Sequence, residues 1–324
     1  MATYTDSFNT MNAIKTMNNL PSPSLDDPEY IRQRDLLDSA LTPEVVEEMR
    51  LMIHGVVNRV LDEINQKYVA PGKPFDLIEA FAAPVPTQIA YKVVGIPEED
   101  VGQLLLQDEQ SLEAYVDKMV DERITEPDSC NRGDLISRLA REQYRKGLMS
   151  RGDIVELALL VLGAGHAALV NSIGLGVLTL FQHPEQWAKV RRNPLAWAPS
   201  VVNECLRYNG LCSSATSSPD VTPSPQIWNG SWTHGRRPSD PQKFDIHRSG
   251  YAPPERQSEH LSRLELEIAL GTLFARFPGL RFDSSAIRDV NTPLVLPPGT
   301  AGVMKLPVQV DTDAEMHRIL ITCD

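Results

Sequence analysis

One stretch of the sequence restricts the possible folds more than any other. The 25 residues from Leu157 to Phe181 contain no Asp, Glu, Lys or Arg. A run of that length can cross a lipid bilayer. It also carries His166 and Asn171, however, and no basic or aromatic anchors flank it, which is unlike a membrane span. The two other interpretations place the run inside a folded domain.

The first of these is a buried strand followed by a dinucleotide-binding turn. Residues 160–162 are apolar, and residues 163–168 read Gly-Ala-Gly-His-Ala-Ala, which fits the GxGxx(G/A) fingerprint. This interpretation predicts a Rossmann-type oxidoreductase that uses NAD(P) or FAD. It also requires an acid at the end of a second strand about 20 residues further on. The sequence there has His183, Pro184 and Glu185, which begin a helix.

The second is one long buried helix over residues 153–181. Ser150 and Asp153 form a pair that resembles a capping box, which starts a helix rather than a strand. No proline follows until Pro184. The small residues 163–165 would let another group approach the backbone closely, or allow a local break in the helix. The pattern therefore favours a helix.

Composition excludes several classes of protein. The 324 residues include 31 basic and 43 acidic side chains, and the net charge of −12 argues against nucleic acid or an anionic membrane as the main partner. The four cysteines are far apart, without a CxxC pair, which rules out a disulfide scaffold and a cysteine-rich zinc module. They are Cys130, Cys205, Cys212 and Cys323. The apolar fraction of 42% is enough for a sizeable core.

The rest of the chain predicts a mainly α protein with minor β structure near the C-terminus. Residues 1–24 are a polar lead-in, and residues 210–240 are irregular, with 17 Ser, Thr, Pro or Gly among 31. We expect a helical core over 25–209 and a C-terminal part over 241–324. The apolar spacing predicts helices over 43–68, 76–94, 98–125, 132–147, 183–192, 199–208 and 258–277, and strands near 295 and over 303–310.

One charged pair in the 199–208 helix is a candidate structural element. Glu204 and Arg207 stand at i, i+3 on one helix face, so their side chains can pair. The neighbouring Val201 and Val202 indicate partial burial. Pairs of this kind are common on exposed helices, so the spacing alone does not identify a site.

Taken in order, these pieces resemble the cytochrome P-450 (haem-thiolate) superfamily, and most of all its fungal nitric oxide reductase type. The resemblance covers about 25–209 and 240–310. It is carried by Asp27–Arg34 with Leu41–Glu44 (the DPPEHxxxR and FTP stretch), Ala164–Ala168 (the AGxxT of the central helix), Glu204 and Arg207 (ExxR), Asp240–Asp245 (the meander) and Glu259–Leu266 (the helix after the ligand cysteine).

The resemblance implies a cytochrome P-450-like, mainly α fold that begins after the family's N-terminal sheet. The implied activity is reduction of nitric oxide to nitrous oxide with NADH or NADPH, or a related monooxygenation, on haem b. A small molecule would be the substrate, and we expect neither nucleic acid nor membrane as a partner. The chain would act as a monomer in the cytoplasm, or in the mitochondrion.

It also implies roles for individual residues. Arg34 would bind a haem propionate by charge-assisted hydrogen bonds, and Tyr30 stands where the family has a second propionate ligand, a histidine. Ala164, Gly165 and Ala168 would lie over the distal face of the haem. Glu204 and Arg207, joined by Arg248, would form the buried group that supports the proximal side.

Further positions depart from the family pattern. Arg256 falls on the position of the cysteine that binds iron, and arginine has no lone pair to give to a metal. Ala168 replaces the central threonine, so its hydroxyl is absent. Ala167 at the acidic position is shared with the nitric oxide reductase type. The alternative to an active enzyme is therefore a non-catalytic remnant, or the product of a defective gene, that does not bind haem-thiolate iron.

Overall fold

A computed structural model describes residues 28–104, 109–126, 132–215, 240, 243–248, 257–283, 303 and 305–311 of the chain. Within these ranges the side chains of residues 28–31, 33, 34, 109, 164–167, 209–215 and 257–259 are not described. The chain divides into two compact units: unit 1 is Met1–Met49, Pro86–Ala168 and Arg256–Ser262, and unit 2 is Arg50–Val85, Leu169–Glu255 and Arg263–Asp324.

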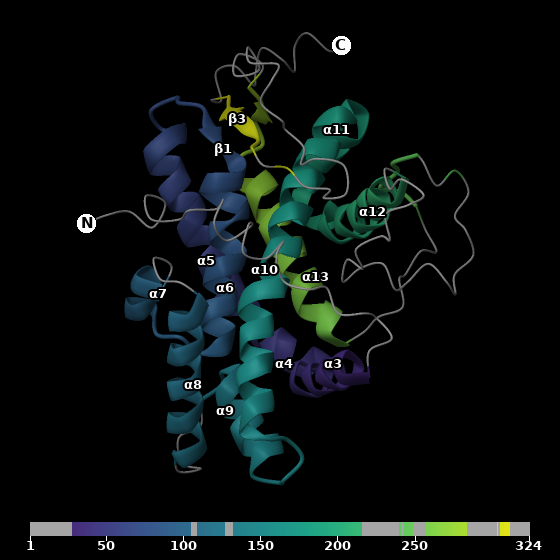
Figure 1. The fold of residues 1–324 in the computed structure, drawn as a ribbon. Helices are drawn as coiled ribbons and strands as arrows, with labels where there is room; N and C mark the ends of the chain where they lie inside the picture. Colours follow the sequence, from purple (N-terminus) through teal and green to yellow (C-terminus); the bar gives the residue numbers. More distant parts are fainter. Residues whose placement is uncertain are drawn as a thin grey trace. The chain divides into compact units, whose positions relative to one another are not determined.

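Unit 1 is helical in its described residues. Its elements are α3 (Pro28–Ala40), α4 (Pro43–Glu48), most of α6 (Pro84–Val94), α7 (Glu98–Leu104), α8 (Glu109–Thr125), α9 (Leu135–Leu139), the π-helical turn η3 (Ala140–Tyr144) and the first part of α10 (Arg151–Gln182). Helix α8 lies beside α9 and η3 (Figure 1). Arg151, at the start of α10, bonds to Asp117 and Asp121 of α8 at 2.8 and 2.6 Å.

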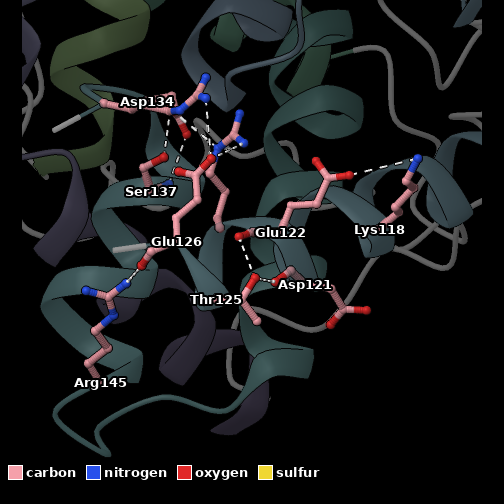
Figure 2. Close-up of polar contacts among 10 residues, drawn as sticks. Lys118, Asp121, Glu122, Thr125, Glu126, Asp134, Ser137 and Arg145 are labelled. Atoms are coloured by element: carbon pink, nitrogen blue, oxygen red, sulfur yellow. Dashed lines mark hydrogen bonds and ion pairs between the residues drawn. The ribbon is translucent and has the colours of Figure 1, made fainter. Parts of the chain in front are cut away.

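Polar groups fix the start of α9 against α8. The Asp134 carboxylate caps α9 by accepting hydrogen bonds from the Ser137 backbone N–H and hydroxyl at 2.9 and 2.8 Å (Figure 2). Arg123 of α8 lies 3.4 Å from Glu126 and 4.0 Å from Asp134. Gly95 permits this arrangement, because its φ is +100° and a Cβ there would lie 2.6 Å from Asp134.

Unit 2 combines helices with a small sheet. Its helical elements are α5 (Arg50–Ile64), the π-helical turns η1 (Asn65–Val69) and η2 (Ile78–Ala82), the second part of α10, α11 (Pro184–Arg192), α12 (Pro194–Ala215) and most of α13 (Gln257–Arg276). The strands β1 (Phe75–Asp76), β2 (Leu280–Phe282) and β3 (Pro307–Val310) form an antiparallel sheet in the order β1-β3-β2. Phe75 pairs with Val308, and Leu280 with Val310.

The apolar stripes predicted from the sequence form the core of each unit. In unit 1 the buried residues include Val94, Val116, Val120, Leu135, Ile136 and Leu139. In unit 2 they include Ile53, Val57, Leu61, Val177, Leu180, Val201 and Phe274. The predicted mainly α fold is therefore confirmed.

Helix α10 settles the interpretation of the charge-free run. It is continuous from Arg151 to Gln182, so the prediction of one helix over 153–181 is confirmed. The capping box is present: the Ser150 N–H donates to the Asp153 carboxylate at 2.7 Å, and the Asp153 N–H donates to the Ser150 hydroxyl at 3.2 Å. The strand required by a dinucleotide turn is absent from residues 157–163, so the Rossmann interpretation is wrong. Its apparent fingerprint consists of small residues inside a helix.

The length and composition of α10 would also suit a membrane span, and among the described residues it is the one helix of that kind. Half of its most apolar window is nevertheless buried inside the structure. Core helices of folded proteins meet the same criteria of length and apolarity. The helix itself thus gives only weak support for a membrane span.

Three local predictions differ from the structure. Pro199 does not open a helix, because α12 begins five residues earlier at Pro194, and Pro199 lies inside it. Pro199 is the sixth residue of α12, past the first turn where proline is tolerated without cost, so it removes one bond of the helix ladder. Residues 75–76 form strand β1 rather than the start of a helix. Helix α12 also continues to Ala215, inside the segment predicted to be irregular, of which residues 216–239 lie outside the described part.

Candidate functional site

The Glu204–Arg207 pair lies in the interior of unit 2. The Arg207 side chain is fully buried and that of Glu204 is 3% exposed. The guanidinium makes a two-pronged contact with the carboxylate: Arg207 Nε donates to Glu204 Oε2 at 2.7 Å, and Nη2 donates to Oε1 at 2.6 Å. The buried neighbours Val201 and Val202 place this face of α12 in the core. The i, i+3 spacing thus produces a buried pair, with the fork geometry that arginine favours.

Residues 243–248 supply further partners of this pair. The Asp245 N–H donates to Glu204 Oε1 at 2.8 Å, and the Lys243 carbonyl accepts from Arg207 Nη2 at 2.9 Å. Arg248 Nε lies 3.4 Å from Glu204 Oε2, and its Nη2 donates to the Lys243 carbonyl at 3.0 Å. A buried ion pair stabilises a fold only when its other hydrogen-bonding positions are satisfied. The backbone of Lys243 and Asp245 supplies such partners to Glu204 and Arg207, whereas the buried Arg248 Nε makes no hydrogen bond to the described residues. We define Glu204, Arg207, Arg248 and the backbone of Lys243 and Asp245 as the buried charge cluster.

Aromatic packing holds this segment in place. Phe244 is 2% exposed, and its ring lies 4.9 Å from that of His183 and 5.5 Å from that of Tyr208. His183 Nδ1 is 2.8 Å from the Thr179 carbonyl at the end of α10. The ring of Phe244 therefore anchors the segment between α10 and α12, and this fixes the backbone groups that reach the buried charge cluster.

Cys205 is the free cysteine of the described residues, and it is buried. Its sulfur lies close to Gly176 of α10. Burial is the main cause that raises the pKa of its thiol, and the negative charge of Glu204 adds to it. The thiol therefore stays protonated at neutral pH. The described residues also contain no group of three His, Cys, Asp or Glu that could hold a metal ion.

The structure brings some of the predicted site residues together and leaves others undescribed. Glu204, Arg207 and Arg248 are in contact. Ala168 lies half-buried in the middle of α10, and Ala164 and Gly165 lie on the same helix with side chains that are not described. Arg34 and Tyr30 lie on α3, also with side chains outside the described set. Arg256 lies outside the described residues.

Sequence reasoning did not find all of the cluster. Lys243 and Asp245 contribute backbone groups, so their side-chain types carry no signal for this role. The detectable sign was indirect. Phe244 is an isolated aromatic residue in a polar stretch, and such a residue is expected to anchor the local chain in a core.

Several curated proteins of known family are similar to this chain, although no family model matches it. A cytochrome P450 55A3 from Fusarium lichenicola is 32% identical over 88% of this chain and 77% of its own length. Pentalenic acid synthase from Streptomyces avermitilis is 32% identical over 88% and 76%. Mycinamicin VIII C21 methyl hydroxylase from Micromonospora griseorubida is 32% identical over 79% and 72%.

Solved structures agree with these relatives. The crystal structure of the Micromonospora griseorubida mycinamicin VIII C21 methyl hydroxylase, bound to mycinamicin VIII, has a TM-score of 0.65 at 28% identity and covers 88% of this chain and 79% of that one. Cytochrome P450 MoxA from Nonomuraea recticatena, at 24% identity, shares the fold with a TM-score of 0.67 over 92% and 81%. The identity and coverage of these relatives, together with the fold, show that the chain belongs to the cytochrome P450 superfamily.

Proposed function

We propose that this chain descends from cytochromes P450 that reduce nitric oxide to nitrous oxide, and that Arg256 leaves it with little or no such activity. The reaction consumes two NO, one NADH or NADPH and one proton, and it yields N2O, water and the oxidised nicotinamide. Haem b would supply the redox chemistry. A reduced nicotinamide would be the electron donor.

The observation that carries the proposal is the pair of alanines at positions 167 and 168. Ala168 lies half-buried in the middle of α10, at the position of the family's central threonine, and Ala167 stands at the acidic position, where the nitric oxide reductase type also has alanine. Oxygen insertion needs protons delivered by a positioned hydroxyl or acid. Alanine can donate no proton, and the preceding residue is also alanine. The alanine at position 167, which the nitric oxide reductase type shares, therefore supports descent from that type.

Oxygen insertion is the second candidate. It is favoured by the names of the bacterial relatives, which include a methyl hydroxylase, a vitamin D3 dihydroxylase from Streptomyces griseolus and a 23-monooxygenase from Streptomyces fradiae. These names describe the activities of the relatives themselves. For this chain they indicate only that a small organic molecule is the substrate class to compare with nitric oxide.

The buried charge cluster fits the role of proximal support, but the described residues do not supply an iron ligand. The haem iron of this family needs a thiolate. The buried thiol of Cys205 stays protonated and packs against α10, so it does not fit that need. Position 256, where the resemblance expects the ligand, is arginine. We therefore derive no reaction step through the haem.

The other site assignments belong to the same proposal. Arg34, and less directly Tyr30, would contact the haem propionates, while Ala164 and Gly165 would lie beside the distal face. The charge of −12 is unsuited to binding nucleic acid. We propose a monomer that works in the cytoplasm, as expected for relatives of bacterial type. No comparison supports a mitochondrial site.

The test compares the wild-type chain with Arg256→Cys after reconstitution with haem. Both are incubated without oxygen with NO and NADH or NADPH, and N2O is measured by gas chromatography. We expect N2O from Arg256→Cys at one N2O per nicotinamide oxidised, and only background from the wild type. The control is Arg276→Cys, which places the same new thiol at the exposed end of α13.

Three outcomes would contradict parts of the proposal. N2O from the wild type at the rate of Arg256→Cys would show that position 256 does not limit activity. Hydroxylation of an added organic substrate by Arg256→Cys, without NO turnover, would favour oxygen insertion. Failure of Arg256→Cys to bind haem with a thiolate spectrum would favour the non-catalytic remnant.

A further inference from the structure

His247 lies at the surface of unit 2, in the segment whose backbone contributes to the buried charge cluster. Its Nε2 is 2.9 Å from Lys189 Nζ on α11. Its ring packs edge-on against that of Trp197 on α12, with 4.8 Å between the ring centroids. Its backbone N–H donates to Asp245 Oδ1 at 3.0 Å. His247 therefore ties residues 243–248 to two helices at the surface of the unit.

The contact between His247 and Lys189 restricts the protonation state of the imidazole. A lysine ammonium has three donors and no acceptor, so its partner must accept. An imidazole nitrogen accepts only while it carries no proton. The 2.9 Å contact therefore requires a bare Nε2, with the single ring proton on Nδ1. When the ring gains a second proton, two cations face each other at hydrogen-bond distance and the contact is lost.

The surface around His247 is mainly basic. The cations on the elements packed against it are Lys189, Arg191 and Arg192 on α11, and Lys243 and Arg248 on its own segment. The acids are Glu185 on α11, and Asp240 and Asp245 near the ring in sequence. The first two turns of α12 contain no charged side chain. A second proton on the ring thus adds positive charge where cations already outnumber acids.

Glu185 is an alternative partner for Lys189. The two residues are four apart on α11, with the glutamate on the N-terminal side, which is the order that favours an ion pair on a helix surface. Both side chains are exposed. In the structure Lys189 contacts His247 instead. The lysine can therefore change its partner by a rotation of its own side chain, without movement of either helix.

We propose that His247 is a pH-sensitive contact, which holds residues 243–248 against α11 while its ring is neutral and releases them when the ring is protonated and Lys189 turns to Glu185. The effect reaches the interior, because the backbone of this segment donates and accepts hydrogen bonds in the buried charge cluster. The relevant range is about pH 5 to 8, where histidine side chains change their charge. The inference needs no haem and is independent of the proposed function.

The first experiment is a double-mutant cycle on the full-length chain, measured by urea unfolding at pH 8 and pH 5. Lys189→Met keeps most of the lysine stem, and His247→Phe keeps a ring beside Trp197 but removes both nitrogens. At pH 8 the pair should favour the folded state by about two- to fivefold, as exposed charged contacts do. At pH 5 this coupling should vanish or become unfavourable.

The control cycle combines Arg192→Met with His247→Phe. Arg192 is an exposed cation in the same turn of α11, and the described contacts of His247 do not include it. This cycle should show little coupling at either pH. A Lys189–His247 coupling that is absent at pH 8, or equal at pH 8 and pH 5, would overturn the proposal.

The second experiment tests the exchange of partners with Glu185→Gln. This variant should lose more stability at pH 5, where Lys189 needs the carboxylate, than at pH 8, where it contacts His247. The pH-dependent part of the loss should disappear when Lys189→Met is also present. An equal loss at the two pH values would contradict the exchange.

The third experiment follows the Asp245 amide, which donates to Glu204 Oε1 at 2.8 Å inside the buried charge cluster. Hydrogen exchange of the peptide that contains Asp245 is measured by mass spectrometry at pH 7.5 and pH 5.5 and corrected for the intrinsic exchange rate. We expect the wild type to lose protection severalfold at the lower pH, and His247→Phe to show the same protection at both. Equal pH dependence in the two chains would overturn the link between His247 and the cluster.

Discussion

Two arginine–glutamate pairs in this chain have the same i, i+3 spacing and very different surroundings. Glu204 and Arg207 in unit 2 are fully enclosed and joined by contacts of 2.6 and 2.7 Å, with further partners from residues 243–248. Arg123 and Glu126 in unit 1 approach only to 3.4 Å, and Glu126 is 24% exposed.

The second pair is part of a looser network. Glu126 also meets Arg132 at 3.3 Å, and its carbonyl accepts from Arg145, a contact shown in Figure 2. Arg123 is 7% exposed, and its Nε makes no hydrogen bond to the described residues, which is also true of Arg248 Nε beside the first pair. The i, i+3 spacing therefore permits both ion pairs. Whether the remaining hydrogen-bonding positions of a pair are filled depends on the more distant segments that pack against it.

The largest expected effect is at Glu204. Glu204→Gln leaves the Arg207 charge buried without its counter-ion, and breaking a buried pair costs about 3–5 kcal/mol. Urea unfolding measures this loss, and a variant too unstable to fold would agree with it. The control Glu204→Leu/Arg207→Met removes both charges and should recover much of the stability. A loss below about 1 kcal/mol for Glu204→Gln would show that the cluster is not charge-dependent.

A smaller effect is expected at Gly95, where the absence of a side chain leaves room for Asp134. Gly95→Ala requires a positive φ of a residue that disfavours it and brings a methyl group onto Asp134. The strain should cost about 2 kcal/mol. Thermal unfolding checks this, with Gly102→Ala as the control because a Cβ at residue 102 meets nothing within 4 Å. Equal melting temperatures for the two variants would argue against the close approach.

Glu126→Gln should have less effect still. Because Glu126 is part-exposed and its ion pairs are long, removing its charge should cost about 1 kcal/mol or less. Urea unfolding of Glu126→Gln and Glu204→Gln under the same conditions compares the two pairs directly through the loss of unfolding free energy in each variant. Equal losses at both positions would remove the distinction between a saturated and a loose pair.

The smallest effect concerns Asp153 at the start of α10. A hydrogen bond from Arg32 lowers its pKa from 3.8 to about 2, with a further contribution from Ser150. The folded form then loses its proton more readily than the unfolded form, so the stability is present above about pH 4 and is lost as the pH falls through 2.

Arg32→Ala should therefore be less stable than the wild type at pH 6 and equally stable near pH 2. Since Arg32 is 44% exposed, the difference at pH 6 should be about 1 kcal/mol or less and should shrink in added salt. Urea unfolding in low and high salt checks both features. A difference that persisted at pH 2 would mean that Arg32 acts through packing and not through Asp153.

The sequence was informative wherever one local pattern determines the structure. The capping box at Ser150 and Asp153 marked the start of α10, and apolar spacing marked the core faces of α5, α8 and α13. Elements that form through contacts with residues far away in the sequence could not be predicted. Strand β1 consists of two residues that exist as a strand only because β3 lies beside them, and Pro199 was misread because the helix begins at Pro194.

The candidate site divides in the same way. Glu204 and Arg207 could be paired by spacing, while the contribution of residues 243–248 came through backbone atoms that no side-chain pattern reveals. The roles of Arg34, Tyr30 and Arg256 toward a haem stay predictions.

The most direct test of this account is the reduced, carbon monoxide-bound spectrum of the wild-type chain after reconstitution with haem. We predict no thiolate-type Soret band from the wild type, because position 256 is arginine and the described thiol at Cys205 is buried and protonated. We also predict that band from Arg256→Cys. A thiolate-type Soret band from the wild-type sequence would contradict the account.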